Sequence, residues 1–262
     1  MEQEIIAYLM NWFNRYVAGF KSGDPSRDTN IVLKEEHTRR VCDEILYIGR
    51  ELRLPPEDLA LAEAIALLHD VGRFEQFARY RTFNDRESAN HAELGVEILR
   101  RNGVLASADP AERELILRAI AYHNRPALPT DESDRCLLFS RMIRDADKLD
   151  IWAVFLDHFA RKDSDPAVIH FLPDTPGFSE KICRQLIARS GVNYAEITNL
   201  NDFKLLQLGW IYDLNFAPAF RRFRERRYLE RYRQFLPKAE LVARALAAAE
   251  AYLAGKEAGS SR

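Results

Sequence analysis

Apolar residues recur at intervals of three and four along almost the whole chain, and this spacing is what most constrains the fold. The members of the first stripe are Ile6, Leu9, Met10, Phe13, Val17 and Phe20. Such spacing places the side chains on one face of an α-helix. The residues KSGDPSRD then interrupt the stripe with turn-forming types. Since no segment shows a competing alternation typical of strands, the sequence predicts an all-α fold.

Further stripes predict a series of helices whose boundaries are good to a few residues. We expect them at about 30–52, 57–69, 87–102, 110–123, 133–160, 177–190, 201–215, 217–235 and 238–254. The breakers between them are short, such as LPPED at 54–58, and we interpret them as connections between helices rather than linkers. We therefore expect a single all-α domain over residues 1–262.

Composition sets limits on function and location. A chain of 262 residues that is 47% hydrophobic can bury a sizeable core. With 38 basic and 40 acidic residues, its charge gives no global argument for binding nucleic acid or an anionic membrane. The three cysteines are widely spaced and lack a CxxC pair, so they indicate neither a disulfide framework nor a cysteine zinc site. Charged and amide residues interrupt the first twenty positions, so we expect no secretory signal or membrane span there and predict a cytoplasmic location.

One arginine-rich segment, RRFRERRYLERYRQF at 221–235, invites comparison with nucleic-acid-binding stripes. Glu225 and Glu230 interrupt its positive run and permit local ion pairs. We therefore interpret the segment as an amphipathic helix with a solvated face. The alanine-rich stretch at 239–254 leaves open whether the chain forms a homodimer.

Several polar side chains fall on the apolar faces of the expected helices. His37 precedes Val41 by four residues, and Asp147 follows Ile143 by four. The other histidines placed in this way are His69, His91 and His123. A buried polar group is costly unless something compensates it. For any one histidine taken alone, a hydrogen-bonded core residue is the commoner interpretation.

Taken together, these residues favour a metal site. Several separate helices each deliver an imidazole or a carboxylate to the buried side, and neutral hydrogen bonds would hardly satisfy such a cluster. A cation would satisfy it. Neutral imidazoles and carboxylates suit manganese, iron, nickel, cobalt or zinc, whereas the absence of nearby thiolates argues against a structural zinc site. Spacing does not choose among these metals.

The order of these residues carries a resemblance. His37, the adjacent pair His69–Asp70, then His91, His123 and Asp147 resemble the ligand series of the HD-domain superfamily of metal-dependent phosphohydrolases. The stretches HDVGRF and RDADKLD are similar to those that flank the family's ligands. The resemblance implies a helical HD core at about 30–160, with additional N-terminal helices and a C-terminal helical elaboration at about 161–255.

The same resemblance implies a ligand set. A first divalent ion would have four ligands, which are His37, His69, Asp70 and Asp147. Asp70 would also bridge to a second ion held by His91 and His123, as in the two-metal branch of the superfamily. The expected reaction is hydrolysis of a phosphomonoester or phosphodiester, of a nucleotide or another small molecule, by a metal-activated hydroxide. The GYP-containing segment of cyclic-diguanylate phosphodiesterases is absent, which argues against that substrate.

Other residues are candidates for contacts with the substrate. Arg73 and Lys148 follow the expected ligands and could bind the substrate phosphate, with a surface cation as the alternative for each. The segment 78–88 could supply further phosphate contacts, or it could simply be a polar loop. Its candidate residues are Arg79, Arg81 and Asn84, with Phe83 as a ring for stacking. Asp150 could orient a ligand histidine, and His158 and His170 are not expected to be ligands.

Three alternative functions remain at this point. Some HD-type proteins with a similar set of four histidines and two aspartates are di-iron oxygenases. In a one-metal nucleotide phosphatase, His91 and His123 would contact only the substrate. A non-catalytic signalling module would retain the site for stability or ligand sensing.

Overall fold

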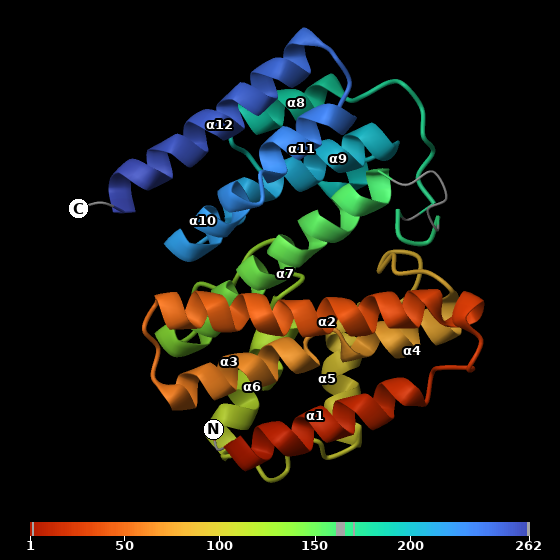
Figure 1. The fold of residues 1–262 in the computed structure, drawn as a ribbon, viewed down its shortest axis with the longest axis vertical. Helices are drawn as coiled ribbons and strands as arrows, with labels where there is room; N and C mark the ends of the chain where they lie inside the picture. The colour runs from red at the N-terminus through yellow and green to blue at the C-terminus, as the bar shows by residue number, and fades with distance from the viewer. Residues whose placement is uncertain (2, 161–165, 170, 261–262) are drawn as a thin grey trace. The chain divides into compact units, whose positions relative to one another are not determined.

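The structure is a computed structural model that describes residues 1, 3–160, 166–169 and 171–260. Every regular element in these residues is a helix (Figure 1), which confirms the all-α prediction. The α-helices as far as the middle of the chain are α1 (Gln3–Ala18), α2 (Pro25–Glu51), α3 (Pro56–Leu68), α4 (Val71–Tyr80), α5 (His91–Arg101), α6 (Pro110–Tyr122) and α7 (Asp134–Ala160). The later α-helices are α8 (Glu180–Ile187), α9 (Leu200–Gly209), α10 (Ala217–Glu225), α11 (Tyr228–Phe235) and α12 (Glu240–Ser260). Two short 3₁₀ helices, η1 (Tyr194–Glu196) and η2 (Trp210–Asp213), lie before and after α9.

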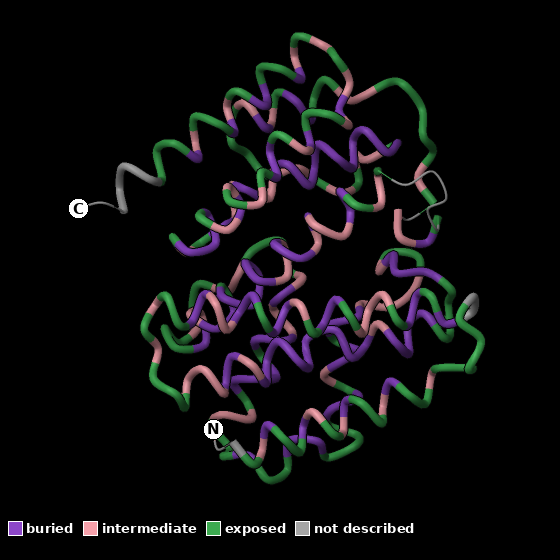
Figure 2. Tube along the Cα trace, in the orientation of Figure 1, coloured by how far each residue is buried: buried purple, intermediate pink, exposed green. Residues whose placement is uncertain are grey.

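The chain divides into two compact units, Met1–Asp150 and Ile151–Arg262, with the boundary inside α7. Figure 2 shows buried residues gathered along the helices of each unit. The division into an HD core and a C-terminal elaboration within one domain stays a prediction. In the part of the chain that the structure describes, no helix combines the length and the apolar character needed to cross a membrane.

Helix α3 forms the centre of the first unit. From Leu61 to Leu68 every residue except Glu63 is buried, because α3 packs against α1, α2 and α6. A helix that is apolar on all sides belongs in the interior of a fold. Its C-terminal cap is His69, so the end of this central helix delivers a histidine into the core.

Helix α4 was not among the helices predicted from the sequence. It follows α3 after a single residue of non-helical geometry, Asp70, with φ −107° and ψ 15°. Gly72 explains why α4 can lie so close to α5: a Cβ there would be 2.0 Å from the carbonyl oxygen of His91 and 2.8 Å from the nitrogen of Gly95. The glycine therefore sets the distance between the His69–Asp70 pair and the start of α5.

The second unit packs around aromatic side chains. The indole Nε1 of Trp152 donates a hydrogen bond to the backbone carbonyl oxygen of Gln207 at 2.9 Å. The hydroxyl of Tyr232 donates to the side-chain oxygen of the same Gln207 at 2.8 Å. The prediction of one helix at 217–235 was wrong. Arg227 adopts φ 54° and separates α10 from α11, because a left-handed residue cannot continue a right-handed helix.

Candidate metal centre

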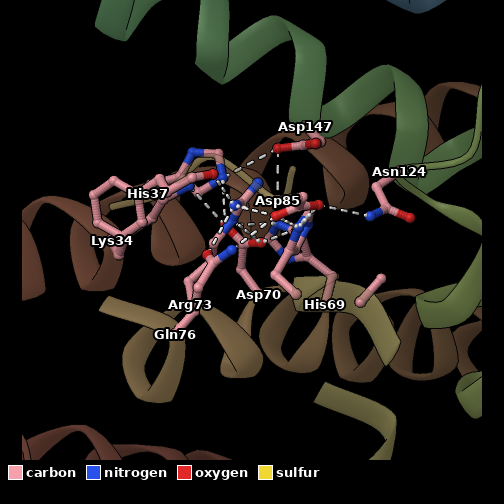
Figure 3. A network of polar contacts seen from close by, with 12 residues as sticks. Lys34, His37, His69, Asp70, Arg73, Gln76, Asp85, Asn124 and Asp147 are labelled. Atoms are coloured by element: carbon pink, nitrogen blue, oxygen red, sulfur yellow. Dashed lines mark hydrogen bonds and ion pairs between the residues drawn. The ribbon is translucent and has the colours of Figure 1, made fainter. Parts of the chain in front are cut away.

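The first unit brings together all six predicted ligands. Figure 3 labels His37, His69, Asp70 and Asp147 among them. Each of the six comes from a different place in the helical framework. His37 lies inside α2, His69 and Asp70 follow the last residue of α3, His91 begins α5, His123 follows the last residue of α6, and Asp147 lies inside α7. All are buried except Asp147, which is half-buried. Three overlapping groups, each with ligand atoms within 4.8 Å of one another, contain all six residues.

Asp70 lies between two pairs of histidines and turns one oxygen toward each pair. Its Oδ2 is 3.5 Å from Nε2 of His37 and 3.8 Å from Nε2 of His69. Its Oδ1 is 3.4 Å from Nε2 of His91 and 3.9 Å from Nε2 of His123. A single carboxylate is therefore shared by two sets of nitrogen donors.

Asp147 lies beside the first pair of histidines, His37 and His69. Its Oδ1 is 3.1 Å from Nε2 of His37 and 3.7 Å from Nε2 of His69. The first set thus contains two histidines and two carboxylates, and the second contains two histidines and the shared carboxylate. This is the division that the resemblance implies, although the role of these residues as ligands stays a prediction.

Each of the four histidines is held by its other ring nitrogen. The Nδ1 contacts are His37 to Asp150 at 2.6 Å, His69 to the carbonyl of Ala66 at 2.7 Å, His91 to Asp85 at 2.7 Å, and His123 to the carbonyl of Ile120 at 2.7 Å. Carbonyl and ionised carboxylate oxygens only accept hydrogen bonds, so each Nδ1 carries a proton. Each Nε2 is thereby turned toward the aspartates, as in histidines that bind metals.

The surroundings of the four Nε2 atoms show whether a cation fits among these residues. Those of His37 and His69 are buried and make no hydrogen bond. Those of His91 and His123 face each other at 3.0 Å. Burial lowers the pKa of both rings, for His123 to about 3, so two neutral acceptors confront each other. Divalent cations would satisfy all four nitrogens, and the residues therefore fit such ions.

The carboxylates carry the negative charge that such ions require. Burial alone would raise the pKa of Asp70, yet Lys34, His69 and Arg73 hold this pKa well below its usual value. Burial likewise opposes ionisation of Asp147, but the neighbouring rings of His37 and His69 keep its pKa well below the usual value. Both aspartates are therefore ionised and available as oxygen ligands.

The structure gives Arg73 and Lys148 local partners. Nη1 of Arg73 donates to the carbonyl of Phe83 at 2.6 Å and to Oδ1 of Asp85 at 2.9 Å. Its Nε lies 3.5 Å from Oδ1 of Asp70. Nζ of Lys148 donates to the carbonyl of Arg144 at 3.3 Å. Arg73 thus borders the cluster and holds the 81–90 loop, while contact of either side chain with a substrate stays a prediction.

The three other candidates for substrate contact lie on α4 and in the loop that follows it. Arg79 is exposed and pairs with the buried Glu75 one turn earlier on α4. Arg81 ends α4 with φ 57° and lies over the ring of Phe77, 5.8 Å from its centroid. Asn84 is buried, and its Oδ1 accepts a hydrogen bond from a backbone nitrogen of the same loop. No contact of these side chains with the six clustered residues is present among the described contacts.

Two charged residues beside the cluster, Lys34 and Asp85, were not predicted from the sequence. Nζ of Lys34 lies 2.8 Å from Oδ2 of Asp70. Lys34 precedes His37 by three residues, so helical spacing could have placed both on one face of α2. Asp85 contacts His91 from a loop, where no periodic signal exists. Asp150 does contact His37 as the sequence analysis suggests, and of the two other histidines His158 lies in the second unit while His170 lies outside the described residues.

Comparison with known protein families agrees with this geometry. Residues 35–152 match the family model of the HD domain. This segment of the chain is an HD domain. All six clustered residues lie within the matched segment, and the HD superfamily consists largely of metal-dependent phosphohydrolases. Neither the comparison with curated proteins nor the comparison with solved structures gives a match.

Proposed function

We propose that this HD-domain protein hydrolyses a phosphomonoester or phosphodiester of a nucleotide or another small molecule, with the help of two divalent metal ions. The observation that carries the proposal is the position of Asp70. Its two oxygens face separate histidine pairs at 3.4 to 3.9 Å. A bridging carboxylate of this kind is typical of two-metal hydrolytic sites.

The second histidine pair, His91 and His123, is buried and oriented like the first pair, and this supports two ions rather than one. His91 and His123 are as buried as the first pair, and each is oriented through Nδ1 in the same way. Residues that only contacted a substrate would not need their Nε2 atoms aimed at a shared carboxylate. His37, His69 and Asp147 would hold the first ion, His91 and His123 the second, and Asp70 both.

Two ions bound by these residues would lower the pKa of water and neutralise the oxygens of a phosphoryl group. The protein's own contribution is to orient the ligand histidines through their Nδ1 atoms. Asp150 and Asp85 hold His37 and His91 in position from outside the cluster. Lys34 and Arg73 add positive charge at the edge of the site, where they could bind an anionic substrate.

The proposal is tested by metal content together with hydrolysis. The wild-type protein should retain two divalent ions per chain after purification without chelator and should hydrolyse members of a panel of small phosphoesters. Asp70→Ala should lose both ions and at least a hundredfold of the activity, because both sets of donors share this residue. Asp131→Ala, which removes an exposed carboxylate of the same unit, is the matched control.

The other outcomes point to different functions. Oxygen consumption by the iron-loaded protein, without anaerobic hydrolysis by the manganese form, would favour the oxygenase alternative. One ion per chain, retained in His91→Ala, would favour a one-metal phosphatase. Bound metal without any turnover would favour a non-catalytic module.

A further inference from the structure

Asp85 lies in the loop between α4 and α5, beside Asn124 in Figure 3, and contacts His91 of the second histidine pair. Four side chains donate hydrogen bonds to its carboxylate. They are Arg73 Nη1 and Gln76 Nε2 at 2.9 Å, His91 Nδ1 at 2.7 Å and Asn124 Nδ2 at 3.1 Å. Guanidinium and amide NH₂ groups can only donate, so Asp85 acts here as an ionised acceptor.

The acceptor oxygens of Asp85 determine which nitrogen of the His91 ring carries the proton. Because Asp85 only accepts, the Nδ1 of His91 carries the proton and its Nε2 presents a lone pair. That Nε2 lies 3.4 Å from Oδ1 of Asp70 and 3.0 Å from Nε2 of His123. The carboxylate of Asp85 therefore aims the ring at the position that a second ion would take.

His91 differs in one respect from His69 and His123. Those two residues follow a complete helix, and each donates to the backbone carbonyl three residues before it. His91 is the first residue of α5 and has no preceding helical turn to supply such a carbonyl. Its orientation depends on a side chain from the loop instead.

The same carboxylate joins the parts of the fold that surround the second pair. Arg73, bound to Asp85, also holds the carbonyl of Phe83 in the loop. Asn124, also bound to Asp85, donates to Oδ1 of Asn90 at 2.8 Å. Asn90 caps the N-terminus of α5, and Asn124 follows His123 directly. Asp85 thus links the start of α5 with the end of α6.

We propose that Asp85 is the positioning residue of the second metal ion, and that the first ion does not depend on it. The inference deepens the proposed function and rests on it, since it assumes the two-metal arrangement around Asp70. Asp150 offers the comparison, because it contacts His37 at 2.6 Å and Arg40 at 2.6 Å but neither histidine of the second pair. The two carboxylates should therefore control different ions.

The experiment is a calorimetric titration of chelator-treated protein with Mn²⁺, combined with elemental analysis of metal per chain. In Asp85→Asn, an amide NH₂ replaces an acceptor among four donors, so the affinity for one of the two ions should fall about 10- to 100-fold while the other is unchanged. Asp150→Asn should weaken the other ion by a similar factor. Glu87→Gln removes an exposed carboxylate from the same loop and should leave both affinities as in the wild type.

Circular dichroism identifies a variant that has not folded, and Asp85→Ala then replaces Asp85→Asn, with the same expected result. Two ions bound by either Asp85 variant with wild-type affinities would overturn the inference. Equal weakening of both ions would overturn it too, because it would indicate a general structural role. Wild-type protein that binds no Mn²⁺ would instead contradict the proposed function, so the two failures are distinguishable.

Discussion

Lys34 lies against the one carboxylate that both histidine pairs share. Its Nζ is 2.8 Å from Oδ2 of Asp70 and 5.4 Å from the centroid of the Phe83 ring. An ammonium group so close to a metal-binding oxygen competes with a cation for the same negative charge. The residue therefore balances the charge of Asp70 while opposing its use as a metal ligand.

Lys34→Met removes this competition at nearly constant side-chain volume. The affinity for Mn²⁺ should rise about five- to tenfold, which corresponds to roughly 1 kcal/mol of electrostatic interaction in a partly solvated site. Calorimetric titration measures the change, and Lys21→Met, at a surface lysine paired with Glu35, serves as the control. Weaker binding of Mn²⁺ by Lys34→Met would mean that the ammonium supports the ligand geometry instead of competing with the ion.

At the scale of elements, the closeness of α4 and α5 determines where the two halves of the cluster lie. Gly72 permits this packing, because a Cβ at that position would meet the backbone carbonyl oxygen of His91 at 2.0 Å. A backbone atom cannot move aside as the end of a flexible side chain can. Separation of the two helices would displace His91, and with it the second histidine pair.

Gly72→Ala should therefore lower the free energy of unfolding by about 2 kcal/mol or more, as overpacking in a core commonly does. Gly95→Ala is the matched control on the facing helix, where a Cβ would meet its nearest neighbours at 3.4 Å. In this second variant, stability should stay the same or rise by up to about 1 kcal/mol, since alanine favours a helix. Urea unfolding compares the two variants, and equal stabilities would show that the packing of α4 on α5 is looser than described.

For the whole molecule, the relevant fact is that all six clustered residues belong to the unit Met1–Asp150. Ions bound only by the folded form stabilise it, by about 2.7 kcal/mol for each site at a free concentration 100 times Kd. That stabilisation acts first on the elements that carry the ligands. The unit Ile151–Arg262 supplies none of them.

Addition of Mn²⁺ to the chelator-treated protein should therefore slow hydrogen exchange in α2, α3, α5 and α6, and leave exchange in α8 to α12 nearly unchanged. Hydrogen-exchange mass spectrometry with and without the ion makes this measurement. A Mg²⁺-free buffer containing Ca²⁺ provides a control with a cation that prefers all-oxygen sites. Equal slowing in both units would mean that the ion couples them.

The sequence by itself determined the helical class and the inward placement of four histidines, which are His37, His69, His91 and His123. Periodicity fixes the face of a helix on which each side chain lies, so His37 and Asp147 could be selected from their apolar neighbours alone. The structure then brought these residues into one cluster, as their inward placement predicts. Their role as metal ligands remains for the metal titrations to test.

Only the tertiary structure decided what surrounds that cluster. Asp85 lies in a loop and reaches His91 through a turn of the chain that no repeating pattern encodes. Helix α4 escaped prediction because only two residues, His69 and Asp70, separate it from α3. The division of the two Asp70 oxygens between histidine pairs likewise depends on how four separate segments pack. Sequence spacing determines local faces, whereas contacts between distant segments depend on the packing of the whole unit.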